Sequence, residues 1–411
     1  MKKILFVHHT PEFVGSARSL FYLLKELDRI KYDPVVSLVY DGPVRKKYED
    51  LGIKVYHVPF TPIWEAPSPY WYNIKNKLMN WFAFLPNRRF GKFLDTIKPD
   101  IVHLNDTACL SAGIAANRCG IPVVTHVRSV HRLKPALLQM RSMLLVKAIE
   151  KISSRIIAIG EEYAIQFGNS KKVEVVYNSL DFPAIEKAVG TGVKFRDEYK
   201  LGKEDILIGM VGTLTRHKGA WDFIKACGMA HRNSTDSKLR FIIVGNIPGE
   251  NILNRFKKNT GIIGLRHPYE HALKLAESNG IADRLFIVGH RQDIYSVMDA
   301  FDVVVFPTRL DATGRPILEA AAMGKPSIAS VPTKDTKVLI DGVTGLIVPP
   351  ENPRALADAI VKLAENQELR GSMGKAGFEL SRKNFDPRIN IGKVQKIYEE
   401  VLEFENAKVQ I

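Results

Sequence analysis

The stretch Ile206-Leu207-Ile208-Gly209-Met210-Val211-Gly212-Thr213-Leu214-Thr215-Arg216-His217-Lys218-Gly219 decides the fold class. Its first six residues are largely apolar, which predicts a strand that is covered on both faces, as in a parallel sheet. A short loop with Gly219 follows, and an amphipathic helix pattern then runs to about His231. A strand that leads through a glycine loop into a helix is the opening unit of a Rossmann-like domain.

The N-terminus opens in the same way. Lys2-Lys3-Ile4-Leu5-Phe6-Val7 leads into a loop with Gly15, and a helix pattern extends from Ser16 to about Leu27. Two such openings about 200 residues apart in a chain of 411 residues predict an α/β protein with two Rossmann-like domains. The expected strands are Ile4–Val7, Val35–Tyr40, Val55–Val58, Ile101–Leu104, Val123–Val127, Ile156–Ile159, Ile206–Val211, Arg240–Val244, Leu285–Val288, Val303–Phe306 and Leu346–Val348.

The domain boundaries follow from composition. We predict an N-terminal domain at 1–180, a polar and irregular linker at 181–205, and a C-terminal domain at 206–385. The last segment, 386–411, carries a helix pattern that could return to the N-terminal domain. Parallel sheets of two such domains would face each other across a cleft, with the ligand loops of both at its walls.

Composition also indicates the compartment. The three cysteines, Cys109, Cys119 and Cys227, have neither metal-ligand spacing nor a disulfide framework, which favours a reducing environment. The N-terminus lacks the apolar core of a signal peptide, and no run of 18 apolar residues exists. We therefore expect a cytoplasmic protein.

The net charge of +15 is unevenly distributed. Residues 61–160 hold 14 Lys and Arg but five Asp and Glu. A basic region of this kind suits nucleic acid, an anionic membrane surface or a phosphate-bearing ligand. No nucleic-acid-binding module is visible, and the neighbouring aromatic residues suit a membrane surface better, so we expect no nucleic-acid partner.

Two loops at predicted strand ends are candidates for binding an anion. Gly15 and Ser16 open the first helix, whose free N–H groups can meet a phosphate; the alternative is an ordinary tight turn. In the second loop, Gly212 is followed by Arg216 and Lys218, which can neutralise a diphosphate. The alternative for this loop is a solvated cationic turn.

The third candidate segment is Phe306-Pro307-Thr308-Arg309-Leu310-Asp311-Ala312-Thr313-Gly314-Arg315-Pro316-Ile317-Leu318-Glu319-Ala320. We predict a strand end, a small-residue loop, and a helix in which Pro316 takes the first position. Backbone N–H groups around Gly314 could face a phosphate. The alternatives make Asp311 a helix cap and Glu319 a surface charge. The run 320–323 looks buried, however, and a carboxylate that enters it needs a partner, such as a ribose diol.

The order of these segments resembles the retaining GT-B glycosyltransferases of family 4, or group 1, over nearly the whole chain. The family's Glu-x7-Glu element corresponds to Asp311-x7-Glu319, and its Gly-x-Pro to Gly324-Lys325-Pro326. The further matches are Asn178-Ser179-Leu180-Asp181, Val244-Gly245-Asn246, Val288-Gly289-His290 and Asp341-Gly342-Val343-Thr344-Gly345-Leu346-Ile347-Val348.

The resemblance implies a role for each candidate. Glu319 would bind the ribose hydroxyls of a nucleotide-sugar donor, and Lys218, with Arg216, the diphosphate. Gly15 with Ser16 would let a loop approach the donor phosphate, and His126 would lie beside the transferred sugar. A quietly hydrogen-bonded histidine is the alternative for His126. The remaining implied donor-binding residues are Gly212, Gly245, His290, Thr313, Gly314, Arg315, Pro316 and Ile317, and Asp311 would be catalytic with His126, Lys218 and Arg216.

The implied activity is transfer of a hexosyl or N-acetylhexosaminyl group from a UDP-sugar to a saccharide or lipid-linked acceptor in surface polysaccharide synthesis. In a retaining enzyme the acceptor attacks on the face that the diphosphate leaves, and the leaving phosphate takes the proton. We expect no cofactor and no metal ion. Two departures, Asp311 for Glu and Thr213 where the family has arginine, also permit a scaffold that binds donor without turnover. A sugar-nucleotide epimerase is a further alternative.

Two amphipathic stretches leave another question open. Apolar residues recur at helical spacing in 70–92 and again in 128–155, with Lys and Arg between or after them. Such helices either pack against the core of the N-terminal domain or lie in a membrane interface. In the second case the protein would be peripheral on the inner membrane face.

Overall fold

A computed structural model describes residues 1–13, 15–60, 62–63, 84–85, 87–129, 136–234, 238–248, 268–309, 314–330 and 337–409. The chain divides into two compact units. Unit 1 comprises Met1–Ser179 and Phe385–Ile411, and unit 2 comprises Leu180–Asn384. Among the helices in these ranges, none combines the length and apolar content that a bilayer crossing requires.

Unit 1 contains a seven-stranded parallel sheet in the order β3-β2-β1-β4-β5-β6-β7. The strand order reverses between β1 and β4, which is where doubly wound sheets bind ligands. The strands are β1 Lys2–His8, β2 Tyr32–Leu38, β3 Lys54–His57, β4 Ile101–Leu104, β5 Val123–Val127, β6 Arg155–Ala158 and β7 Val173–Val175.

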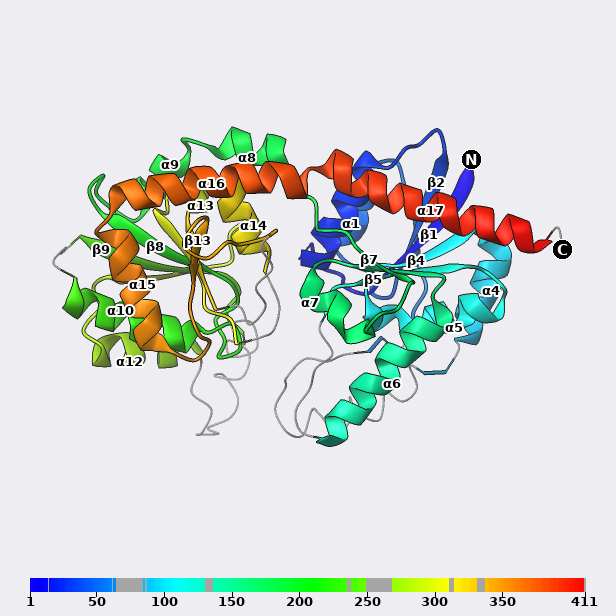
Figure 1. The fold of residues 1–411 in the computed structure, drawn as a ribbon, viewed down its shortest axis with the longest axis horizontal. Helices are drawn as coiled ribbons and strands as arrows, with labels where there is room; N and C mark the ends of the chain where they lie inside the picture. Colours follow the sequence, from blue (N-terminus) through cyan, green and yellow to red (C-terminus); the bar gives the residue numbers. More distant parts are fainter. Residues whose placement is uncertain are drawn as a thin grey trace, which may run out of the picture. The chain divides into compact units, whose positions relative to one another are not determined.

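Helices cover both faces of this sheet. Successive strand residues point to opposite faces, and successive apolar residues in β1, β4 and β5 are buried, so both faces need a covering layer. On one face, Ile4 and Phe6 of β1 pack with α1, α2 and α17. Figure 1 shows α17, the last helix, returning along unit 1 beside α1. The helices are α1 Gly15–Glu26, α2 Val44–Glu49, α4 Arg88–Ile97, α5 Leu110–Arg118, α6 Ala136–Ile152, α7 Glu161–Ala164 and α17 Pro387–Val409.

Unit 2 contains a six-stranded parallel sheet in the order β10-β9-β8-β11-β12-β13. Its order reverses between β8 and β11, so the two units have the same kind of switch point. The strands are β8 Ile206–Val211, β9 Leu239–Val244, β10 Leu285–Gly289, β11 Val303–Phe306, β12 Ser327–Ala329 and β13 Gly345–Ile347.

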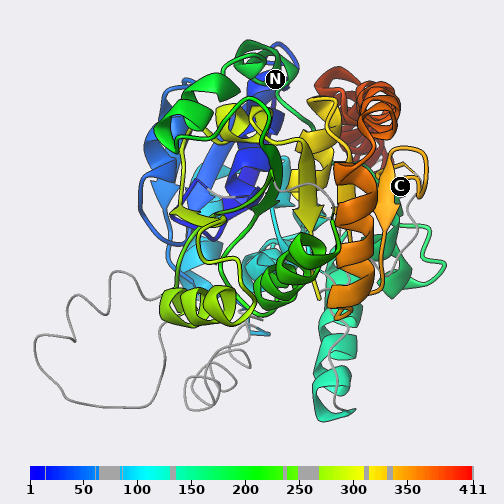
Figure 2. The same ribbon diagram turned by 90° about the vertical axis from the view of Figure 1, so that its left-hand side faces the viewer.

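Unit 2 buries a separate core on each face of its sheet. Ile208 and Met210 of β8 contribute to one core with α10, α12 and α15, whereas Leu207 contributes to the other with α9, α13 and α14. Figure 2 shows α10 (green) beside α15 (orange). The helices are α8 Phe182–Ala188, α9 Gly192–Glu198, α10 Ala220–Asn233, α12 Pro268–Ser278, α13 Ile294–Asp299, α14 Arg315–Ala322, α15 Pro353–Ala364 and α16 Gln367–Phe385.

The stretch 181–205 is not the irregular linker that composition predicts. It forms α8 and α9, both of which belong to unit 2 and contact α13. The Asp181 carboxylate accepts the N–H of Ala184 at 3.2 Å and caps α8. Phe182 and Phe195 bury their rings. Each of these helices has seven residues, so its few apolar side chains do not establish a helical period that stands out from the polar background.

The expected strands are all present, with ends that differ by up to three residues. Two short strands, β7 and β12, are additional. Each has three residues, and β12 begins with a buried serine, Ser327. Segments of this length carry no periodicity, so only pairing with a neighbouring strand identifies them.

Candidate functional site

The switch point of unit 2 brings two of the predicted loops together. The loop after β8 and the loop after β11 are joined by a backbone hydrogen bond from Arg309 N to the carbonyl oxygen of His217, 3.0 Å long. Gly219 has φ +77°, and a Cβ at this position would lie 1.6 Å from the carbonyl oxygen of Pro307. Residues about 90 positions apart in sequence therefore form one surface at the carboxyl end of the sheet.

Lys218 is a partly buried cation of this surface. Its Nζ lies 5.7 Å from the centroid of the Phe306 ring. Burial lowers the pKa of the Lys218 ammonium. Within the described ranges, this ammonium has no carboxylate partner, so a bound anion would offset the cost of its burial. Arg216 is exposed at the rim of the same loop.

The loop after β11 leads into α14, whose N-cap residue, Gly314, has no side chain with which to cap the helix. Gly314 precedes the helix, and a Cβ there would lie 2.2 Å from the Phe306 ring. Arg315 is the first helical residue and Pro316 the second, so Pro316 is one position later than predicted. Because Pro316 has no N–H and Ile317 N donates to the Gly314 carbonyl at 3.2 Å, this turn offers fewer amides to a phosphate than we expected.

Glu319 lies in the buried face of α14 and is 2% exposed. The alternative of a surface charge is therefore wrong. Its Oε1 accepts from Arg315 Nε at 3.3 Å and from the Tyr295 hydroxyl at 3.4 Å. Arg315, one helical turn earlier, offsets the burial of the carboxylate. Sequence analysis missed Tyr295 because only the fold brings α13 beside this part of α14.

The remaining predicted residues of unit 2 surround the same edge. Gly212 N donates to Val244 O, and a Cβ on Gly245 would lie 2.1 Å from Gly212 O, so these positions join β8 to β9 by close backbone contact. His290 is exposed and follows β10. Asp311 and Thr313 lie outside the residues that the structure describes.

The carboxyl edge of unit 1 is polar and buried. His126, the penultimate residue of β5, is 4% exposed, and its Nδ1 lies 3.0 Å from His103 Nε2. Burial lowers the pKa of His126 well below its usual value, and the Arg128 guanidinium adds to this. Arg128 donates to the carbonyl and the side-chain oxygen of Asn105 at 2.8 and 3.0 Å, and to Asn178 Oδ1 at 2.6 Å.

Asn105 connects this edge to the first predicted loop. Since its Oδ1 accepts from Arg128, its Nδ2 is the donor to Ser16 O at 3.1 Å and to His8 Nδ1 at 2.9 Å. Sequence analysis missed Asn105, although it directly follows β4 in the way that the other candidates follow their strands. Around Gly15, the described residues leave open space for a Cβ.

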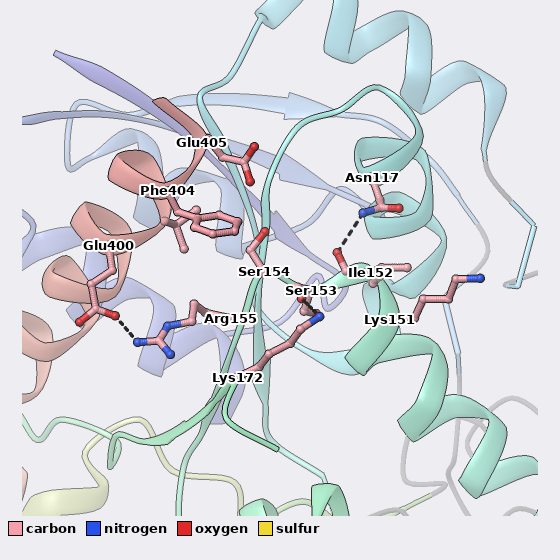
Figure 3. A pocket seen from close by; sticks show the side chains of 11 residues that line it. Asn117, Lys151, Ile152, Ser153, Ser154, Arg155, Lys172, Glu400, Phe404 and Glu405 are labelled. Atoms are coloured by element: carbon pink, nitrogen blue, oxygen red, sulfur yellow. Dashed lines mark hydrogen bonds and ion pairs between the residues drawn. The ribbon is translucent and has the colours of Figure 1, made fainter. Parts of the chain in front are cut away.

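A cavity lies elsewhere in unit 1. It has a volume of about 500 Å³ and is lined by residues around the starts of β6 and β7, at the amino end of the parallel sheet, and by residues of α5 and α17 (Figure 3). Arg155 pairs with Glu400, and Lys172 Nζ donates to Ser153 O at 2.9 Å. These groups hold α6 and α17 to the sheet. The cavity is therefore separate from the carboxyl-edge site.

No cluster of three or more His, Cys, Asp or Glu side chains able to hold a metal ion occurs among the residues given a position. The expectation that the reaction needs no metal stays a prediction.

Two family models match the chain in succession. Residues 13–182 match the model described as Glycosyltransferase Family 4, and residues 193–380 match that described as Glycosyl transferases group 1. The first match falls on unit 1 except for its last three residues, and the second falls on unit 2.

Curated relatives agree with these matches. The chain is 28% identical over 210 residues to the alpha-D-kanosaminyltransferase of Streptomyces kanamyceticus, covering 51% of this chain and 49% of the relative. It is 26% identical over 289 residues to an Escherichia coli UDP-Gal:alpha-D-GlcNAc-diphosphoundecaprenol alpha-1,3-galactosyltransferase, covering 68% and 70%. The chain spans about half the length of the first curated relatives that it matches.

The fold is also found in solved structures. Anabaena Alr3699/HepE, crystallised in complex with UDP and glucose, superposes with a TM-score of 0.75 at 20% identity, covering 97% of this chain and 100% of that chain. WaaG, a glycosyltransferase involved in lipopolysaccharide biosynthesis, gives 0.66 at 14% identity, covering 96% and 99%. The two parallel sheets, the successive family matches and these relatives together show that the chain belongs to the group 1 glycosyltransferases and has the GT-B fold.

Proposed function

We propose that the protein is a retaining glycosyltransferase that moves a hexosyl or N-acetylhexosaminyl group from a UDP-sugar to a saccharide or lipid-linked acceptor in surface polysaccharide synthesis. The observation that carries the proposal is that two groups lie at the carboxyl edge of the same sheet of unit 2: the buried carboxylate of Glu319, and the ammonium of Lys218, which has no counter-ion among the described residues. A nucleoside diphosphate presents a ribose diol and a diphosphate, which suit these two groups. UDP in the Anabaena structure and in the name of the Escherichia coli relative supports uridine as the base.

The proposed chemistry depends mainly on stabilising the leaving group. Lys218 and Arg216 neutralise charge that develops on the diphosphate as the glycosidic bond breaks. The acceptor hydroxyl attacks from the same face, and its proton passes to the leaving phosphate. Asp311 and His126 orient the transferred sugar, with no protein base required.

A thermal-shift comparison with UDP, GDP, ADP and their sugars tests the donor site. A ligand at 100 times its dissociation constant adds about 2.7 kcal/mol to the free energy of unfolding. We expect this shift with the uridine compounds, and its loss in Glu319→Ala. Glu379→Ala, which removes an exposed carboxylate from α16, is the matched control. A stable protein that shifts with none of the nucleotides would overturn the proposal.

Release of UDP separates transfer from the two alternatives. A scaffold would bind a UDP-sugar without releasing UDP, and an epimerase would change the sugar without an acceptor. We expect UDP release that depends on a saccharide acceptor and persists in EDTA, because the proposed mechanism uses no metal ion.

We also propose that unit 1 binds an anionic membrane surface through α6. Leu145 and Ile149 of this helix are buried, but Met143 and Leu144 are 59% and 42% exposed beside the exposed Lys147. Exposed apolar and cationic side chains on one helix suit a membrane interface. The segment 64–83, which holds most of the other predicted amphipathic stretch, lies outside the described residues.

Sedimentation with vesicles of anionic lipid at low salt tests this second proposal. We expect Met143→Gln/Leu144→Gln to weaken binding, whereas Ile30→Gln, at a position 88% exposed elsewhere in unit 1, leaves it unchanged. Equal binding of the double variant and the wild type would exclude α6 as the contact.

A further inference from the structure

A chain of three buried side chains connects the last helix to the carboxyl end of β5. The Tyr398 hydroxyl of α17 lies 2.6 Å from His103 Nδ1, and His103 Nε2 lies 3.0 Å from His126 Nδ1. Tyr398 and His103 have no exposed surface, and His126 retains 4%. The alternation of strand residues places both histidines on the face of the sheet that α17 covers, where Ile101 and Val124 contribute to the core.

Each imidazole in this chain is neutral in the folded protein. Burial lowers the pKa of His103 to about 3 and lowers that of His126 well below its usual value. A neutral ring has one N–H and one nitrogen lone pair, so a single hydrogen bond of known direction fixes both of its nitrogens.

Tyr398 sets the direction. Its hydroxyl forms one hydrogen bond with the described residues, that to His103. If it accepted a hydrogen bond from His103, its own O–H would be buried without an acceptor among the described residues, and buried donors without a partner are rarer in proteins than oxygens with an unused lone pair. Tyr398 is therefore the donor, and His103 Nδ1 accepts.

The direction of the hydrogen bond from Tyr398 to His103 fixes the direction of the next one, from His103 to His126. His103 has its N–H at Nε2 and donates it to His126 Nδ1, which leaves the N–H of His126 at Nε2. His126 Nε2 has no hydrogen-bond partner in the described part of the chain, unlike the corresponding atom of His8, which lies 2.8 Å from Thr10 Oγ1. The row of hydrogen bonds thus ends at the Nε2–H of His126, a donor that has no acceptor among the described protein groups.

We propose that Tyr398, acting through His103, holds His126 in the Nε2–H tautomer, so that His126 donates a hydrogen bond to an oxygen of a bound saccharide and does not act as a base. Tyr398 and His103 are positioning residues in this arrangement. The saccharide part of the inference rests on the proposed transferase function, whereas the tautomer does not.

Nitrogen NMR of ring-15N-labelled histidine in the full chain tests the tautomer directly. The His126 signals are assigned from His126→Gln. We expect Nδ1 of His126 to have the shift of an unprotonated ring nitrogen and Nε2 that of a protonated one between pH 6 and 8. A proton on Nδ1, or an even mixture, would overturn the proposal.

Two variants test the positioning residues. His103→Leu removes the donor to His126, so its two nitrogen signals should move toward each other as the tautomers mix. Tyr398→Phe removes one oxygen and keeps the ring packing. Without the hydroxyl, Nδ1 of His103 lacks this partner in either tautomer, so the free-energy difference between the two tautomers becomes smaller. We therefore expect the two His126 nitrogen signals to move toward each other, by less than in His103→Leu. Unchanged signals in either variant would remove that residue from the proposal.

Transfer kinetics test the saccharide contact. We expect His103→Leu to lower kcat/KM about tenfold, the effect of weakening one hydrogen bond, while the affinity for UDP stays unchanged. Unchanged kcat/KM with a mixed tautomer would refute the saccharide contact. If the wild type does not bind UDP at all, the proposed function fails, but the NMR result still decides the tautomer.

Discussion

The α-carbon of Gly219 lies against the carbonyl of Pro307, so close that a Cβ would be 1.6 Å from that oxygen. This contact holds the loop after β8 to the end of β11. The left-handed φ of +77° and the lack of space both require glycine.

Gly219→Ala is expected to lower the free energy of unfolding by about 2–5 kcal/mol, the sum of left-handed strain and overpacking. Urea unfolding measures the change. Gly212→Ala in the same loop is the control, because its nearest contacts would be ordinary ones at 3.9 Å. If both variants unfold alike, the close contact with Pro307 has no energetic role.

Gly15→Ala is expected to leave stability nearly unchanged, because the described residues approach no closer than 4 Å to the added methyl group. If a donor phosphate approaches this backbone, the methyl group should weaken UDP-sugar binding by about tenfold, the loss of one hydrogen bond. Titration calorimetry with a UDP-sugar measures this effect. Normal affinity would mean that Gly15 serves only the turn.

Arg309 forms two hydrogen bonds to the carboxylate of Asp222, at 2.8 and 2.7 Å, with side chains 15% and 7% exposed. Asp222→Ala leaves the guanidinium largely buried, and the exposed Glu351 is then its one side-chain partner among the described residues, so we expect a loss of about 3 kcal/mol in the free energy of unfolding. Adding Arg309→Met should recover part of that loss. A double variant less stable than Asp222→Ala would contradict this account.

Lys218→Met is expected to keep or slightly raise stability, because burial already disfavours the charged ammonium, as its lowered pKa indicates. The same change should weaken UDP binding at least tenfold, since it removes a charge that the diphosphate would neutralise. Comparing thermal unfolding with and without UDP separates the two effects. Unchanged UDP affinity would exclude Lys218 from the donor site.

Acid should destabilise unit 1 through its buried histidines. Burial lowers the pKa of His103 to about 3 from the usual 6.5, so between these values the unfolded chain binds the additional proton. Stability therefore falls as the pH drops below about 6.5, and for His103 alone the loss from pH 7 to pH 5 is about 2 kcal/mol. His103→Leu should show a correspondingly smaller difference between the two pH values.

The strands were predictable because each is a run of apolar residues long enough to stand out. Glu319 was predictable as buried because a small apolar run follows it. In contrast, α8 and α9 are short helices in a polar stretch, and only their packing against α13 makes them part of unit 2. The start of α14 was predicted one residue too late, at Pro316 and not at Arg315, because a sequence pattern locates the end of a helix only to within one or two residues.

The sequence by itself determined the two α/β units, the loops at their strand ends and the family resemblance, because apolar runs, glycines and their order are local properties of the chain. The tertiary structure decided which side chains are hydrogen-bond partners. Tyr295 meets Glu319, Asn105 meets Ser16, and Tyr398 meets His103 across 295 positions of the sequence. Hydrogen bonds of this kind depend on which strands and helices lie side by side, and no local pattern encodes that.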